Sequence, residues 1–191
     1  MLFRSVKLVQ TTKEVRSGKK HFPLFQLAIF VAVMGLVGFG FVRYVLAPPE
    51  SSSSAPQYVG SLKITSLVEG ADAQSQINKL HGTSITLENA FIAEYQPPYG
   101  GEYLMVWVGE AGSEAAADDL INRMVAGIKR GGSPFSNPRQ VQVDGYDIWQ
   151  ADGTGGNFYF YKSPERVDRV IWLTIEGKGG AALLESAVKA F

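Results

Sequence analysis

Apolar residues fill one unbroken stretch near the start of the chain. Residues 24–42 (LFQLAIFVAVMGLVGFGFV) contain one polar side chain, Gln26, and twelve Leu, Ile, Phe or Val residues. A helix of this length is roughly 28 Å long, which matches the hydrocarbon thickness of a bilayer. Because no side of the segment is polar, it differs from the amphipathic helix of a soluble core. We therefore predict a transmembrane helix over residues 22–46.

The composition changes after this segment. Residues 47–57 are rich in Pro and Ser and hold little that a core would bury, which is typical of a linker. Residues 58–191 are enough for one compact core, and we see no internal repeat in them. The chain is therefore expected to display one folded domain on a short tether.

The spacing of apolar residues in residues 58–191 predicts strands and helices in turn. Short runs rich in aromatic and β-branched residues indicate strands, and apolar residues three or four apart indicate amphipathic helices. Strands are predicted at residues 58–66, 85–96, 102–108, 139–143, 146–151, 157–162 and 169–175, and helices at residues 70–80 and 114–130 and after Gly180.

Local signals mark several ends of these elements. Ser113 is a good N-cap for the long helix, and Gly131-Gly132 would end it. Asp144-Gly145 is the signature of a type I′ hairpin turn. Hairpin connections between neighbouring strands make the sheet mostly antiparallel. We predict an α+β domain of two layers, with the helices on one face of the sheet.

Charge predicts the orientation in the membrane. Residues 1–21 carry six Lys or Arg and one acidic residue, Glu14, whereas residues 57–191 carry 11 basic and 16 acidic side chains. By the positive-inside rule, residues 1–21 form a basic cytoplasmic tail and residues 58–191 an extracytoplasmic domain at the plasma membrane. The lipid bilayer is then the first expected partner. The alternative is a signal peptide cleaved after Val45-Leu46-Ala47, although Pro48 directly follows that site.

The composition excludes several kinds of chemistry. The chain has no Cys and two His, His21 and His81, so thiolate zinc sites and sites of several His are excluded within one domain. Gly153-Thr154-Gly155-Gly156 lacks the spacing of a phosphate-binding loop and precedes a strand, so a hairpin turn is expected. The acidic domain argues against nucleic acid as a partner. We predict no cofactor and no metal.

Candidate catalytic groups are few. No Gly-x-Ser-x-Gly motif is present, and His81 alone could complete a Ser/His/Asp triad in the domain. Asp144, Asp147 and Asp152 cluster in the sequence near the glycines of residues 153–156. They could serve a membrane-tethered hydrolase, but Asp is also common in turns for backbone reasons.

Aromatic residues of the later strands suggest a binding surface. In NFYFY (residues 157–161), alternation places Phe158 and Phe160 on one face and Tyr159 and Tyr161 on the other. One interpretation is a Phe core face with a Tyr outer face. The other is an exposed aromatic patch of Tyr159 and Tyr161 with Tyr146 or Trp149, which would bind a ligand, a glycan or a partner protein.

These features together predict a single-pass membrane protein without catalytic activity. Its domain would be an accessory or sensor module of the cell envelope, with a membrane or envelope protein as a partner. The membrane-tethered hydrolase that uses the carboxylates of residues 144–156 is the alternative.

Overall fold

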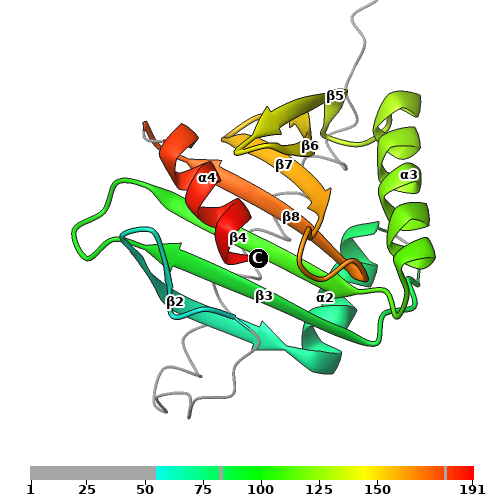
Figure 1. The fold of residues 1–191 in the computed structure, drawn as a ribbon, viewed down its shortest axis with the longest axis horizontal. Helices are drawn as coiled ribbons and strands as arrows, with labels where there is room; N and C mark the ends of the chain where they lie inside the picture. The colour runs from blue at the N-terminus through cyan, green and yellow to red at the C-terminus, as the bar shows by residue number, and fades with distance from the viewer. Residues whose placement is uncertain (1–54, 82–83, 179) are drawn as a thin grey trace, which may run out of the picture. The chain divides into compact units, whose positions relative to one another are not determined.

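The computed structural model describes residues 55–81, 84–178 and 180–191. Their eight strands form one antiparallel sheet in the order β1-β2-β3-β4-β8-β7-β6-β5 (Figure 1). The strands are β1 (Tyr58–Val59), β2 (Leu62–Glu69), β3 (Asn89–Gln96), β4 (Tyr103–Glu110), β5 (Ser136–Val143), β6 (Tyr146–Asp152), β7 (Asn157–Lys162) and β8 (Arg169–Glu176). The predicted α+β class with an antiparallel sheet is confirmed.

Three helices accompany this sheet in the described part of the chain: α2 (Gly70–His81), α3 (Glu114–Arg130) and α4 (Gly180–Ala190). The predicted ends of α3 are confirmed. The Ser113 side chain accepts a hydrogen bond from the backbone N–H of Ala116, and Gly131, at φ 79°, donates its N–H to the carbonyl of Ile128. Positive φ together with an extended ψ of 179° is a backbone conformation that essentially only glycine adopts, which explains why the helix ends at this residue.

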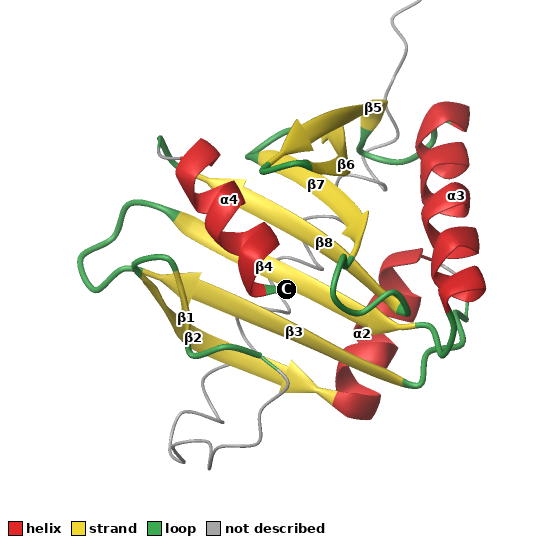
Figure 2. Ribbon diagram, in the orientation of Figure 1, coloured by secondary structure: helices red, strands yellow, loops and turns green. Residues whose placement is uncertain are grey.

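The helices lie on both faces of the sheet, so the prediction of two layers with helices on one face is wrong. Alternate residues of a strand point to opposite faces. Val106 and Leu173 pack with Leu184 of α4, whereas Met105 and Val170 pack with Ala73 of α2 and Leu120 of α3. Figure 2 shows α4 in front of the central strands and α2 behind them. The domain therefore has three layers.

The sheet curls around α4. This helix contacts β8 in the middle of the sheet and also β1 and β5, its two edge strands. In a flat sheet those edges would be about 34 Å apart, whereas a helix with its side chains is about 10 Å wide. Two contacts bring the edges inward: the Lys189 Nζ lies 3.0 Å from an Asp144 carboxylate oxygen, and Gly60 lies against the Ser186 side chain. We call the side that holds α4 the concave face and the other side the convex face.

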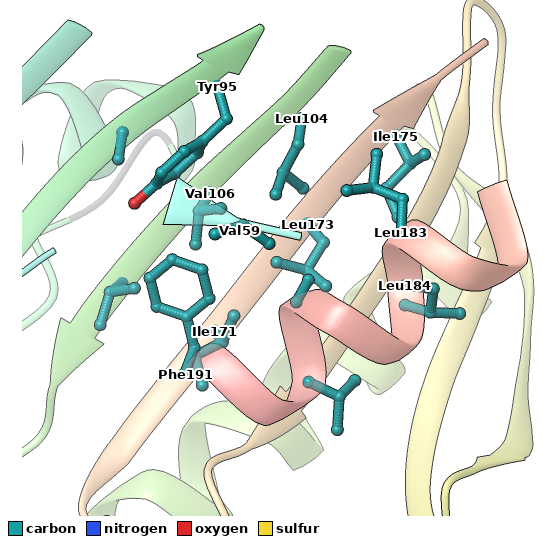
Figure 3. Close-up of a cluster of buried hydrophobic side chains, with 14 of the residues drawn as sticks. Val59, Tyr95, Leu104, Val106, Ile171, Leu173, Ile175, Leu183, Leu184 and Phe191 are labelled. Carbon is teal, nitrogen blue, oxygen red and sulfur yellow. The ribbon is translucent and has the colours of Figure 1, made fainter. Parts of the chain in front are cut away.

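The main core lies between α4 and the concave face (Figure 3). Leu183 and Leu184 point from α4 towards the central strands, and Phe191 lies near Tyr95. The Phe191 ring centroid is 6.2 Å from the ring centroids of both Phe91 and Tyr95. The Tyr95 hydroxyl donates a 2.9 Å hydrogen bond to the carbonyl of Pro56. The first and last described segments therefore meet at Tyr95.

The β5–β6 hairpin has the predicted turn. Val143 pairs with Tyr146, which leaves a two-residue loop of Asp144 (φ 50°) and Gly145 (φ 86°). Positive φ at both positions is the mark of a type I′ turn. The first strand differs from the prediction, because a turn at Gly60 (φ 58°) separates β1 from a longer β2.

The membrane-related predictions concern other residues. The predicted tail (residues 1–21) and span (residues 22–46), and most of the linker (residues 47–57), lie outside the described residues. Within the described ranges, no helix is long and apolar enough to cross a bilayer.

Candidate functional site

The structure does not gather the four predicted aromatic residues on one surface. Tyr161 is 2% exposed in the core under α4, and Tyr159 packs half-buried on the same concave face. Trp149 lies on the convex face, where it packs against the α3 side of the sheet. Tyr146 is 41% exposed at the start of β6. The prediction of an exposed patch that includes Tyr161 is therefore wrong, because β7 is an inner strand of the sheet and is covered on both faces.

The aromatic rings of the convex face form part of the core instead. The Phe160 ring stacks between Trp149 and Trp172, with centroid distances of 6.2 and 5.4 Å. Phe135 packs on Trp172 at 4.7 Å, and Val125 and Ile128 of α3 close the cluster. These rings run across β6, β7 and β8 below α3. Their arrangement explains the aromatic strands by packing alone.

The three carboxylates of the hydrolase alternative point to different partners. Asp144 pairs with Lys189, Asp147 accepts a hydrogen bond from Gln142, and Asp152 lies 2.7 Å from Arg139. Hydrogen bonds from Arg139 and Asn137 lower the pKa of Asp152. Asp147 and Asp152 are about 16 Å apart along β6 and on opposite faces. This geometry gives no support to paired acid–base chemistry in the turns.

The glycine-rich segment and the histidine of the domain have structural roles. Residues 153–156 connect β6 to β7, and a Cβ at Gly153 would lie 2.6 Å from the Phe158 ring. The close approach of that ring explains the glycine. His81 ends α2, and its Nδ1 lies 2.8 Å from the carbonyl of Ile77.

A polar group that the sequence interpretation missed lies on the convex face of β3, β4 and β8. Glu94 and Tyr103 are diagonal neighbours on β3 and β4 and are hydrogen-bonded, and Tyr103 lies directly opposite Glu176. Burial raises the pKa of the Glu94 carboxyl, and the hydrogen bond from Tyr103 opposes this shift in part. Burial, and then the nearby charges of Glu94 and Glu176, raise the pKa of the Tyr103 hydroxyl.

We call Glu94, Tyr103 and Glu176, together with the neighbouring Ser66, the Glu94 site. Some of its polar atoms have no hydrogen-bond or salt-bridge partner. Ser66 pairs with Glu94 across β2 and β3, and its buried hydroxyl has no hydrogen-bond partner. Among the described residues no cation forms a salt bridge with Glu94 or Glu176. The described part of the chain also contains no cluster of three or more His, Cys, Asp or Glu that could hold a metal ion. The partly exposed Glu94 and Glu176 carboxylates therefore offer acceptors to a donor or a cation of a ligand, whereas the Ser66 hydroxyl is closed off from solvent.

One signal in the sequence could have revealed this site. In the strand NAFIAEYQ, Glu94 follows Ala90 and Ile92 in the same alternating row. A charged residue in an otherwise apolar row that faces the core is unusual, because burial penalises its charge.

Comparison of the chain with protein-family models, with curated proteins and with solved structures gives no match.

Proposed function

We propose that this chain is a single-pass plasma-membrane protein whose extracytoplasmic α+β domain is a non-catalytic binding module of the cell envelope. The Glu94 site is the proposed contact for a membrane or envelope protein. A Lys or Arg side chain, or another hydrogen-bond donor, would bind between the Glu94 and Glu176 carboxylates. The observation that supports membrane anchoring is the apolar segment of residues 24–42, which follows six basic residues.

The arrangement of polar side chains favours binding over catalysis. Glu94 lies on an inner strand of the sheet and is hydrogen-bonded to Tyr103, and the neighbouring Glu176 supplies a further acceptor. A half-buried carboxylate becomes easier to ionise when a cation approaches it. Nucleophilic or paired acid–base chemistry would need reactive groups that converge, and the turn carboxylates do not converge.

Topology is tested by single cysteines, since the natural chain has none. Ser5→Cys tests the tail and Glu165→Cys tests an exposed loop of the domain. In intact cells, a membrane-impermeant maleimide should label position 165 and leave position 5 unlabelled. Position 5 should be labelled only after the membrane has been permeabilised. Labelling of position 5 in intact cells, or release of the full chain into the soluble fraction, would contradict the anchored topology.

The binding role is tested by affinity purification of the full chain from detergent-solubilised membranes. Partner proteins that copurify with the natural chain should be lost from Glu94→Gln and Tyr103→Phe. They should remain with Asp147→Asn, a matched change of an exposed carboxylate. Recovery of the natural chain without partners, or equal recovery with all variants, would contradict a binding role for the Glu94 site.

A further inference from the structure

One end of the domain carries exposed tyrosines. Tyr99, in the loop between β3 and β4, is 99% exposed, and Tyr58 of β1 is 57% exposed. The register Tyr58–Lys63–Gln96 across β1, β2 and β3 places Tyr58 at the sheet end from which this loop projects (Figure 1). We call this end, with Tyr58, the 97–101 loop and the β8–α4 turn, the loop end.

The Tyr99 loop carries no charge. Its five residues, 97–101, read PPYGG, and Gly100 (φ 76°) and Gly101 (φ 122°) adopt backbone angles that favour glycine. Two prolines restrict the backbone before Tyr99. An aromatic side chain is thus presented at the tip of a neutral loop and contacts no core cluster.

Exposed lysines lie beside this loop. Lys63 pairs with Gln96, the residue before the loop, and is exposed. Lys178 is exposed in the β8–α4 turn, which lies against the other side of the loop: a Cβ at Gly177 would be 3.0 Å from the Cα of Glu102. Tyrosine rings prefer the headgroup region of a bilayer. Glu102 and Glu176 also flank the loop, so the two lysines give it no excess of positive charge, and the Tyr99 ring is the group that would contact lipid.

The length of the tether limits how far the domain can move from the membrane. Ala55 and Pro56 pack on the domain, so residues 47–54 remain between the predicted span and the packed part of the chain, and eight residues reach at most about 26–29 Å when fully extended. A compact domain of 134 residues is about 36 Å across. The loop end therefore stays within reach of the lipid surface.

From these observations we infer that the loop end docks on the outer surface of the bilayer, with the Tyr99 ring in the headgroup region. This inference rests on the membrane anchoring of the proposed function. Docking would hold the domain in one orientation, so that the Glu94 site would face a partner in the same membrane.

The test uses the full chain in vesicles of phosphatidylcholine and phosphatidylglycerol. Tyr99→Cys and the matched control Tyr146→Cys, an exposed tyrosine at the other end of the sheet, each carry one nitroxide label. Collisions with oxygen, relative to those with a water-soluble nickel complex, report the depth of each label. We expect a ratio severalfold higher at position 99 than at position 146, and a thermal unfolding transition unchanged by either label.

Two failures are distinguishable in this experiment. If the full chain does not float with the vesicles, membrane anchoring is wrong and the docking inference is overturned with it. If the chain floats and position 99 is as accessible to nickel as position 146, the docking inference alone is overturned.

Discussion

The guanidinium of Arg169 and the carboxylate of Glu110 form a buried ion pair on the concave face. Arg169 Nη2 lies 2.8 Å from Glu110 Oε1, and the two side chains are 9% and 13% exposed. Arg166 Nη1 approaches the same oxygen at 3.0 Å from the β7–β8 loop. Ser163 of this loop also donates a 2.6 Å hydrogen bond to the carbonyl of Phe191. The pair therefore lies where β4, β8 and the end of α4 meet.

Removal of one partner from this pair should destabilise the domain strongly. In Glu110→Ala, Arg169 would remain buried with no carboxylate, which costs about 3–5 kcal/mol in comparable pairs. The free energy of unfolding is measured by urea denaturation, followed by the fluorescence of the three tryptophans, all of which lie in the domain. Asp119→Ala removes the exposed pair with Arg123 and should cost less than about 1 kcal/mol. An equal loss of unfolding free energy in Glu110→Ala and Asp119→Ala would contradict the larger contribution expected of the buried ion pair.

Two buried tyrosines should respond in opposite directions to loss of the hydroxyl. Tyr95→Phe removes the hydrogen bond to Pro56 and should cost about 0.5–1.5 kcal/mol. Tyr161→Phe removes a buried hydroxyl with no partner and should raise the free energy of unfolding by about 1 kcal/mol. The same urea denaturation compares both. A loss in Tyr161→Phe as large as that in Tyr95→Phe would show that the Tyr161 hydroxyl has a partner.

Substitution of two glycines by alanine should also change the stability in opposite directions. Gly145 is the second residue of the type I′ turn at φ 86°, so Gly145→Ala should cost about 1–2 kcal/mol. Gly127 lies within α3, where a Cβ meets no atom within 4 Å, so Gly127→Ala should stabilise the domain by about 0.5–1 kcal/mol. Thermal unfolding monitored by circular dichroism measures both shifts. A gain in stability for Gly145→Ala would contradict the turn geometry.

The Glu94 carboxyl should make the stability of the domain depend on pH. Its pKa is raised in the folded domain, so the native state holds this proton to higher pH than the unfolded chain does. Between the two pKa values the native state binds more protons, and the contribution of Glu94 to stability is lost as the pH rises. Glu94→Gln has no such loss. Its free energy of unfolding, relative to that of the natural chain, should rise from pH 4 to pH 7 in urea denaturation; a constant difference would contradict the raised pKa.

The best-predicted elements carry their signals within a few residues. The limits of α3 follow from Ser113 and Gly131, and the β5–β6 turn follows from Asp144-Gly145, because capping and turn geometry depend on local backbone chemistry. The position of β1 was less predictable. Its two residues are held by α4 and by the Gly60 turn, which depend on contacts with distant residues.

The candidate site was less predictable than the elements. The alternation in NFYFY correctly separates Tyr161 from Phe160, but it cannot tell that α4 covers the tyrosine face. That outcome depends on the position of β7 between β6 and β8 and on a helix that follows much later in the chain. Glu94 was missed for the same reason, since its closeness to Tyr103 and Glu176 depends on strand register.

The contact of α4 with both edge strands has a consequence for biogenesis. The ribosome makes this helix after every strand that the helix contacts, so the apolar concave face of the sheet is uncovered until α4 has been synthesised. Until residues 180–190 emerge, nothing draws Gly60 and Asp144 inward. Closure of the domain must then follow the synthesis of residues 180–190, and a chain that ends before this helix would expose its apolar concave face to proteases and chaperones.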